Sequence, residues 1–252
     1  MALIKTAEQI DRIKQSAKLL ASILKYLHRI ANVGTNLLEL ESLARREIAA
    51  AGATPAFLGY NQDGAAEPFP FALCASLNNV IVHGRPHDYL LRSGDILKLD
   101  LGINWRGGIS DAAISIPIGE ITQTDKKLIR ITQESLWMGI KKARPGRTTG
   151  DIGHAIENTI IGGGFFVVDG LTGHGVGEKV HEEPTIYNFG ESGRGVELRP
   201  GMVLALEPMA ATGSSKIKQL PDESYATYDG SNSAHFEHTV LITKKGAVVL
   251  TG

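Results

Sequence analysis

Residues 95–115, DILKLDLGINWRGGISDAAIS, read as two β-strands joined by a tight turn at Arg106-Gly107-Gly108. Side chains alternate between the two faces of a strand, so one face of the first strand is apolar. That face carries Leu97, Leu99, Leu101 and Ile103. The opposite face carries Lys98 and Asp100. The stretch therefore predicts a hairpin with one face packed on a core and one face polar.

Asp111 begins the second strand of this hairpin, eleven residues after Asp100. The two carboxylates are then expected to face the same way on neighbouring strands. An aspartate inside an apolar strand is costly unless it is paired or bound to a cation. For either residue alone, a solvated surface strand is the competing interpretation.

Hydrophobic periodicity predicts the remaining elements. An amphipathic helix over 6–31 begins with a capping box formed by Thr6 and Gln9. Further helices are expected over 36–51, 124–143 and 149–161, and strands over 71–83, 94–105, 109–118 and in much of the chain after Phe165.

A weak internal repeat relates 34–52 to 146–164 at an offset of 112. Any two amphipathic helices could align about as well, which is the simpler explanation. A real repeat predicts an α+β fold of two related halves, about 1–121 and 122–252, with a site between them. The sequence contains no Pro/Ser-rich linker, so we expect one domain spanning 1–252.

Bulk composition narrows the class of protein. The chain has 252 residues and a net charge of −1, which argues against a general nucleic-acid binder. A single cysteine, Cys74, cannot form an internal disulfide and fits a reducing cytoplasm. The first residues are too charged for a signal peptide, and no apolar run is long enough to span a membrane. We expect a cytoplasmic protein with neither nucleic acid nor membrane as a partner.

Two further carboxylates stand beside apolar strands. Glu207 ends the run PGMVLALEPM, and Glu237 lies in SAHFEHTVLIT. Four converging carboxylates could not share a pocket without positive charge. Together with an imidazole, such a set suits a pair of divalent cations.

The stretch GHGVGEKVHEEP, residues 173–184, supplies that imidazole. It lacks the third glycine of a dinucleotide-binding loop and the second histidine of HExxH, and Pro184 would break a helix. Its glycines let the backbone approach an ion closely. His174 is therefore the candidate ligand, and His181 the candidate for contacting substrate.

Taken together, these motifs closely resemble type I methionine aminopeptidases, in the pita-bread metallopeptidase family M24. The resemblance covers nearly the whole chain, and the matching stretches are NNVIVHG, GDILKLDLG with SDAAISIPIG, GHGVGEKVHEEP, RPGMVLALEPM and SAHFEHT. The resemblance implies a pita-bread fold, with a pseudo-twofold repeat and a central antiparallel sheet flanked by helices. It also fills all five of the family's metal-ligand positions, with Asp100, Asp111, His174, Glu207 and Glu237.

The resemblance further implies a reaction: removal of the N-terminal methionine from nascent proteins when the second residue is small. Two divalent ions (Co, Mn, Fe(II), Zn or Ni) would be the cofactors. The catalytic residues would be His83, His181 and Glu207, with His83 and His181 contacting substrate. The substrates would be nascent polypeptides near the ribosome, and the enzyme a monomer.

The expected methionine slot departs from the family pattern. Its lining is expected to be Phe57, Tyr60, Phe69, Cys74 and Val180, with His235 nearby in contact with substrate. The segment NQDGAAEPFP, 61–70, looks like an insertion beside it, and Asn79, Val180 and His235 replace the residues usual in the family. The metal centre is thus better defined than the shape of the slot.

Two other functions remain open. An Xaa-Pro peptidase uses the same fold and ligands, although EPM and FEHT favour the methionine branch. A metal-free binding protein of the same fold would have lost ligand residues, whereas this chain keeps all five.

Overall fold

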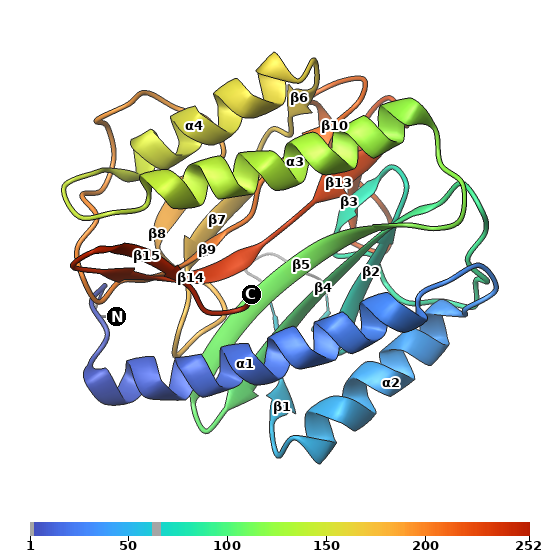
Figure 1. The fold of residues 1–252 in the computed structure, drawn as a ribbon. Helices are drawn as coiled ribbons and strands as arrows, with labels where there is room; N and C mark the ends of the chain where they lie inside the picture. The colour runs from blue at the N-terminus through green and yellow to red at the C-terminus, as the bar shows by residue number, and fades with distance from the viewer. Residues whose placement is uncertain (1–2, 62–66) are drawn as a thin grey trace.

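The hairpin predicted from residues 95–115 lies at the centre of the fold (Figure 1). The computed structural model describes residues 3–61 and 67–252. Strand β4 (Ile96–Trp105) pairs antiparallel with β5 (Gly108–Pro117). In their register Asp100 lies opposite Ala113, and Asp111 lies opposite Gly102. The two aspartates therefore share one face of the hairpin as diagonal neighbours, as predicted.

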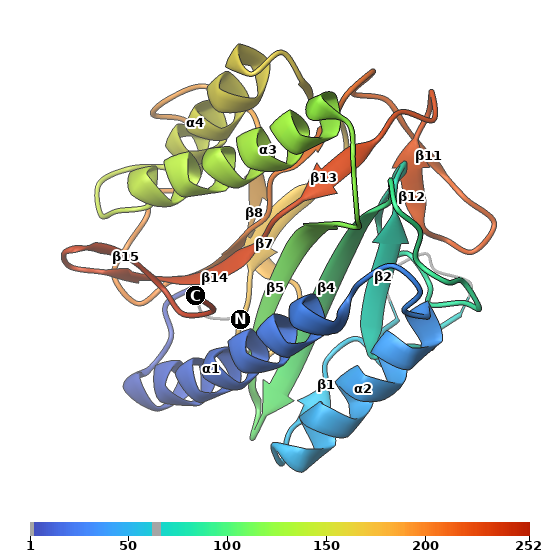
Figure 2. The same cartoon turned by 45° about the vertical axis from the view of Figure 1, so that its right-hand side comes forward.

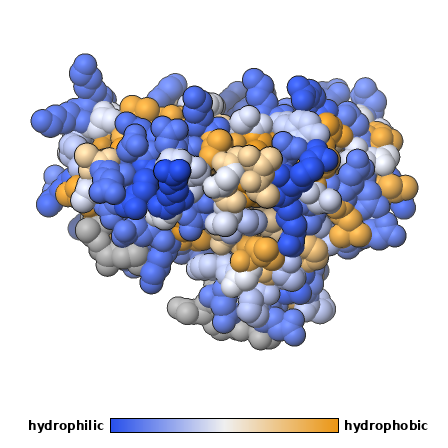
Figure 3. Space-filling view, turned by 90° about the horizontal axis from the view of Figure 1, so that it is seen from below, coloured by the Kyte–Doolittle hydropathy of each residue, from blue (hydrophilic) through white to orange (hydrophobic). Residues whose placement is uncertain are grey.

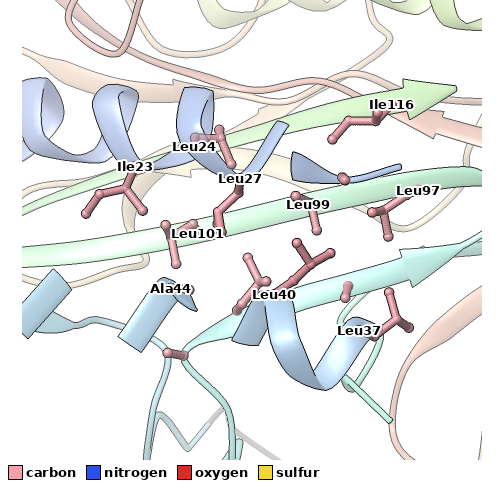
Figure 4. Packing of buried hydrophobic residues seen from close by; sticks show 14 of the residues in the cluster. Ile23, Leu24, Leu27, Leu37, Leu40, Ala44, Leu97, Leu99, Leu101 and Ile116 are labelled. Carbon is pink, nitrogen blue, oxygen red and sulfur yellow. The ribbon is translucent and has the colours of Figure 1, made fainter. Parts of the chain in front are cut away.

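The apolar face of β4 packs on two helices, α1 (Ala7–Ile30) and α2 (Leu37–Ala50). Figure 4 shows this layer, in which the labelled side chains are Ile23, Leu24, Leu27, Leu37, Leu40, Ala44, Leu97, Leu99, Leu101 and Ile116. All of these side chains are buried. This apolar contact fixes which face of the hairpin is left for the polar side chains.

Helix α1 begins at the predicted capping box, in which Thr6 accepts from the Gln9 backbone and Gln9 accepts from the Thr6 backbone. Helix α2 begins after Asn36, whose side chain accepts from the Leu38 N–H.

In the view from below, the molecular face is mostly hydrophilic, with hydrophobic residues in small separate patches (Figure 3).

Two elements of the second half match elements of the first at an offset of 112. Helix α3 (Gln123–Lys142) precedes α4 (Thr149–Gly162), and α4 matches α2 residue for residue at that offset. The same offset relates strand β1 (Thr54–Pro55) to β6 (Phe166–Val167). Figure 2 shows the two helix pairs, α1 with α2 and α3 with α4, on either side of the central strands.

All strand pairs in the described residues are antiparallel. One sheet has the order β1-β4-β2, with β5 on β4, and includes β2 (Leu73–Leu77). A second has the order β15-β14-β9-β7-β8, formed by β7 (Thr172–Gly175), β8 (Glu182–Tyr187), β9 (Val203–Leu206), β14 (His238–Thr243) and β15 (Gly246–Val249). These sheets meet where Ala113 and Glu237 exchange backbone hydrogen bonds of 3.4 and 2.9 Å.

Two smaller sheets border the larger ones. One has the order β13-β10-β6, with β10 (Met209–Ala211) and β13 (Ser233–His235). The other has the order β11-β12-β3, with β3 (Val80–Val82), β11 (Ile217–Gln219) and β12 (Tyr225–Thr227). The predicted α+β class, with antiparallel sheets flanked by helices, is confirmed.

One predicted strand is wrong in its extent. Residues 71–83 do not form a single strand, because the chain turns at Asn78 and Asn79 between β2 and β3. Asn78 has a φ of 51°, a left-handed conformation that asparagine tolerates better than most residues. Strand β3 consequently leaves β2 and pairs with β12.

No helix of the described residues is long and apolar enough to cross a membrane.

Candidate metal centre

A cavity of about 880 Å³ opens on the polar face of the β4–β5 hairpin. Most residues predicted for the site line it: Phe57, Tyr60, Phe69, Cys74, His83, Asp100, Asp111, His174, His181, Glu207 and Glu237. They come from segments far apart in the chain. The fold therefore gathers into one cavity the residues that the motifs had suggested separately.

The five candidate ligands are placed by strands and strand ends. Asp100 lies on β4, Asp111 on β5 and His174 on β7. Glu207 lies between β9 and β10, and Glu237 between β13 and β14. Antiparallel pairing fixes such positions more rigidly than a loop would.

Hydrogen bonds to the main chain hold two of these positions. The Asp111 N–H donates to the Thr239 hydroxyl at 2.9 Å, and that hydroxyl donates to the Asp111 carbonyl at 2.7 Å. The Asn188 side chain donates to the Glu207 carbonyl at 3.0 Å. Neither contact uses the carboxylate, so both side chains stay available to the cavity.

Asp111, His174 and Glu237 each offer one ligand atom, and these atoms lie within 4.8 Å of one another. Nδ1 of His174 is 2.9 Å from the Gly175 carbonyl, which accepts its hydrogen. That bond directs Nε2 toward the acids, and Nε2 lies 3.2 Å from Oε1 of Glu207. A metal-ligating histidine is usually oriented by a hydrogen bond from its other ring nitrogen, as His174 is by its bond to Gly175.

Three buried carboxylate oxygens lack a hydrogen-bond partner among the described residues: Oδ1 of Asp100, Oδ1 of Asp111 and Oε1 of Glu237. Buried polar atoms are rarely left without a partner in folded proteins. Carboxylate oxygens are ligands that hard and borderline divalent cations accept. These residues therefore fit a divalent metal site.

The pKa values of the acids in this cluster are shifted far from their usual range. Burial and the neighbouring acids Asp111 and Glu207 raise the pKa of Asp100 well above its usual range. Burial likewise raises the pKa of Glu237, with Asp111, Glu207 and Asp100 adding to the shift. Burial raises the pKa of Asp111 to about 7, although His174 acts in the opposite direction. Without cations, several of these acids therefore resist ionisation.

Glu207 differs from the other acids. Burial would raise its pKa, but the imidazoles of His174 and His235, 3.2 and 3.5 Å from its oxygens, outweigh burial and bring the pKa to about 2. His174 shows the reciprocal effect: burial would lower its pKa, and the Glu207 carboxylate raises it overall. Glu207 is consequently the carboxylate that stays ionised at neutral pH without a cation.

The two predicted substrate-contacting histidines both line the cavity. The Tyr60 hydroxyl lies 2.7 Å from Nδ1 of His181, and the ring centres of His174 and His181 are 4.4 Å apart. Burial lowers the pKa of His181 to about 4, helped by His174, so His181 is neutral at pH 7. His83 has a φ of 59°, and burial lowers its pKa.

Two residues predicted to face substrate lie elsewhere. Val180 does not line the cavity, but belongs to a buried cluster against which Phe57 and Tyr60 pack. His235 is also absent from the lining, and its Nε2 lies 3.5 Å from Oε2 of Glu207. Val180 thus supports the slot wall from behind, and His235 contacts an acid rather than the cavity.

The segment 61–70 is only partly described, because residues 62–66 lie outside the described residues. Asn61, Glu67 and Phe69 line the cavity, which agrees with the expected position of the segment beside the slot. Leu171, Met209 and Tyr225 also line the cavity and were not predicted. Met209 stood in the EPM motif and Leu171 just before GHGVG, so proximity to those motifs was the available signal.

Sequence patterns also missed a buried ion pair beside His181. The Lys5 ammonium contacts the Glu182 carboxylate, and both side chains are almost inaccessible. The other Glu182 oxygen accepts the N–H groups of Glu178 and Lys179 at 2.8 and 3.0 Å. This pair ties the loop that carries His181 to the start of the chain.

Comparison with known proteins agrees with this geometry. A sequence model of metallopeptidase family M24 matches residues 11–244. The methionine aminopeptidase of Clostridium perfringens is 41% identical, over 100% of this chain and 99% of that protein. The chain belongs to the type I methionine aminopeptidases of family M24. The predicted family is therefore confirmed.

Solved structures of this aminopeptidase family have the same fold. The methionine aminopeptidase of Thermotoga maritima superposes with a TM-score of 0.94 at 38% identity, covering 98% of both chains. The prolidase of Pyrococcus furiosus superposes with a TM-score of 0.78 at 23% identity, covering 99% of this chain and 65% of that one. The prolidase likeness concerns the fold alone.

Metal binding should depend on pH. A cation needs the ionised form of Asp111, whose pKa is about 7 in the metal-free protein, so protons compete with the cation. We expect the affinity for Mn²⁺ to weaken as the pH falls from about 8 to about 6, with protons released on binding. Calorimetric titrations in buffers of different ionisation enthalpy measure both quantities.

The raised pKa of Asp111 also decides how the free energy of unfolding of the metal-free protein changes with pH. The folded protein holds a proton on Asp111 that an unfolded aspartate has lost, in the window from roughly pH 4 to pH 7. The free energy of unfolding contributed by Asp111 therefore falls as the pH rises through that window. Asp111→Asn should remove the share of the proton release that comes from Asp111, while Asp100 and Glu237, whose pKa values are also raised, still release theirs. Binding that is independent of pH and releases no protons would contradict the proposed ligand.

Proposed function

We propose that the protein removes the N-terminal methionine from polypeptides whose second residue is small, in a reaction that depends on divalent metal. The observation that carries the proposal is the cavity in which Asp100, Asp111, His174, Glu207 and Glu237 converge. The full-length similarity to proteins named methionine aminopeptidase supports the same reaction.

We infer that all five of these side chains hold metal, and that two divalent ions bind. Four carboxylates and one imidazole offer enough oxygen and nitrogen ligands for a pair of ions. Co, Mn, Fe(II), Zn and Ni all accept such ligands. Bound ions of this kind activate a water molecule and polarise a carbonyl group.

His181 is proposed to stabilise the negative charge that develops on the scissile carbonyl oxygen. A neutral imidazole carries one N–H and one acceptor nitrogen. When Nδ1 accepts the hydrogen of the Tyr60 hydroxyl, 2.7 Å away, Nε2 becomes the donor. A donor fixed in this way needs little reorganisation as the charge forms, which is the requirement for this type of catalysis.

His83 is proposed to contact the amide nitrogen of the scissile bond, and Glu207 is proposed to accept a proton. His83 lines the cavity and is kept neutral by burial, so it could contact the peptide N–H or assist the leaving amine. Glu207 is ionised at neutral pH, as a proton acceptor must be. Its low pKa makes it a weak base while His174 and His235 face it, so accepting a proton requires His174 to give up that contact.

The methionine side chain is proposed to occupy the apolar part of the cavity. Phe57, Tyr60, Phe69 and Cys74 line that part, with Met209 as an addition from the structure. A cavity of mixed apolar walls and a few convergent polar groups is the usual form of a small-molecule site. His83 and the 61–70 segment would crowd the second residue of the substrate.

An Xaa-Pro peptidase is the main rival. The X-Pro aminopeptidase of Thermotoga maritima superposes with a TM-score of 0.76 at 20% identity, and this chain covers 62% of it. Methionine aminopeptidases match over nearly their whole length, which favours the methionine branch. A metal-free binding protein is disfavoured by the ligand set, none of whose positions is lost.

Nascent polypeptides near the ribosome are the proposed partners, and the enzyme is proposed to act as a monomer in the cytoplasm. The buried free thiol of Cys74 is compatible with a reducing compartment. A single domain with two related halves, about 1–121 and 122–252, is likewise our proposal.

Replacing His181 should slow the chemical step and spare metal binding. We expect His181→Ala to lower kcat by about 10²–10³-fold, the effect of losing one oxyanion donor. Steady-state kinetics on Met-Ala-Ser, with metal content measured on the same samples, test this. His28→Ala changes an exposed histidine on α1 and serves as the control. Loss of bound metal from His181→Ala would contradict the assigned role.

Substrate choice tests the proposed function itself. We expect efficient hydrolysis of tripeptides in which Gly, Ala or Ser follows Met, and poor hydrolysis when Leu, Lys or Phe follows. At the first position an apolar slot separates side chains that differ by one methylene by only ~1–3 kcal/mol, so some cleavage after norleucine is expected. The measurement is kcat/KM over a panel varied at both positions.

Equal rates for Met-Ala-Ser and Met-Lys-Ser would refute crowding at the second position. A strong preference for Pro at the second position, with indifference to the first residue, would move the assignment to the Xaa-Pro branch.

A further inference from the structure

Lys98 is fully buried, which is unusual for a lysine, and its ammonium contacts no carboxylate in the hydrogen bonds of the described residues. Nζ donates to the Asn78 carbonyl at 2.6 Å and to the carbonyl and hydroxyl oxygens of Ser233, both at 3.3 Å. Three acceptors match the three N–H groups of an ammonium. These contacts join β4 to two other segments.

The oxygens that Lys98 binds are themselves crowded with donors. The Asn78 carbonyl also accepts the Ser233 N–H at 3.1 Å and the Ser233 hydroxyl at 3.0 Å. A carbonyl oxygen has two lone pairs, so three donors exceed its ordinary capacity. A positive charge is the donor that gains most from such a concentration of carbonyl dipoles.

Both segments held by Lys98 lead directly to a histidine of the site. Asn78 is followed by β3, which ends one residue before His83. Ser233 begins β13, which ends at His235, 3.5 Å from Glu207. Figure 1 places β3 and β13 together beside the central strands. Lys98 thus lies at the start of both strands, and each histidine at the far end.

The backbone of the first segment is strained at both ends. Asn78 and His83 have φ values of 51° and 59°, in the left-handed region that residues other than glycine rarely occupy. Such conformations persist only where the surroundings enforce them. After His83, Gly84 is fixed by hydrogen bonds to Ala75 and Ser76, of 2.8 and 3.0 Å. Before it, Asn78 is held by bonds to Asp95 and Ile96, and Nζ of Lys98 joins the Asn78 carbonyl to Ser233.

We propose that Lys98 is a positioning residue for the reaction, which sets the place of the His83 imidazole by clamping the turn at Asn78 to Ser233. The proposal rests on the proposed function, in which His83 contacts the reacting amide. Lys98 itself does not line the cavity and touches no reacting atom. Its side chain points to the same face of β4 as Asp100, so one strand supplies both a candidate ligand and the clamp.

The first test removes the ammonium and keeps the aliphatic stem. We expect Lys98→Met to lower kcat on Met-Ala-Ser by about 10–100-fold, since a displacement of about 1 Å can cost that much. KM should change little, because the lost interaction belongs to the transition state. The control is Leu40→Ala, a buried change in α2 away from the cavity, which should lower the unfolding midpoint and keep kcat.

A double-mutant cycle shows whether Lys98 acts through His83. In a His83→Ala background, adding Lys98→Met should lower kcat by no more than roughly 3-fold, because effects on one shared function do not add. Full additivity would overturn the proposal. Ser233→Ala keeps the lysine and removes one of its three acceptors, so it gives the same test if Lys98→Met does not fold.

Histidine NMR separates failure of this proposal from failure of the proposed function. In protein labelled with ¹⁵N-histidine, the His83 ring signals should shift in Lys98→Met, while those of the exposed His28 stay in place. This readout needs no activity. Unmoved His83 signals would overturn the positioning role, even in an active enzyme. If the His83 signals move in Lys98→Met but the unmodified, metal-loaded protein does not cleave Met-Ala-Ser, the positioning role holds and the proposed function is rejected.

Discussion

The rest of the structure depends on one constraint, the burial of several carboxylates side by side. Asp111, Glu207 and Glu237 are buried together, and Asp100 is partly buried beside them. Carboxylates removed from water repel one another, and each unpaired one costs several kcal/mol. Among the described residues, Glu207 is offset by its contacts with two histidines, and His174 offsets the burial of Asp111 in part. The remaining unpartnered oxygens point to cations as the missing positive charge.

The fold meets this constraint by taking ligands from both halves of the chain. Asp100 and Asp111 come from the hairpin of the first half, and Glu237 from the second. The backbone bonds between Ala113 and Glu237 join the two sheets beside the cluster. Apolar packing of α1 and α2 on the other face of the hairpin leaves its polar face for the cavity (Figure 4). Ligand geometry is thus set by strand register at Asp100, Asp111 and His174 and by the ends of strands at Glu207 and Glu237.

Alternation in residues 95–115 was enough to predict the hairpin and the shared face of its two aspartates, because period-two burial is a local property. The length of 71–83 could not be predicted in the same way. A run of β-formers does not reveal that Asn78 turns into a left-handed conformation, since its hydrogen-bond partners Asp95, Ile96, Lys98 and Ser233 come from other segments. Val180 was misplaced for a similar reason, as no periodicity orients a side chain in the loop 176–181 between β7 and β8. Pairwise contacts such as that of Tyr60 with His181 require the tertiary structure.

Anomalous diffraction from crystals grown with Mn²⁺ tests the metal centre most directly, because it locates the ions without assuming any activity. We predict anomalous density among the carboxylates of Asp100, Asp111 and Glu237, in contact with His174 and Glu207. Density found only elsewhere on the protein, with Glu207 still paired to His174 and the acids unliganded, would contradict a metal centre at this cavity.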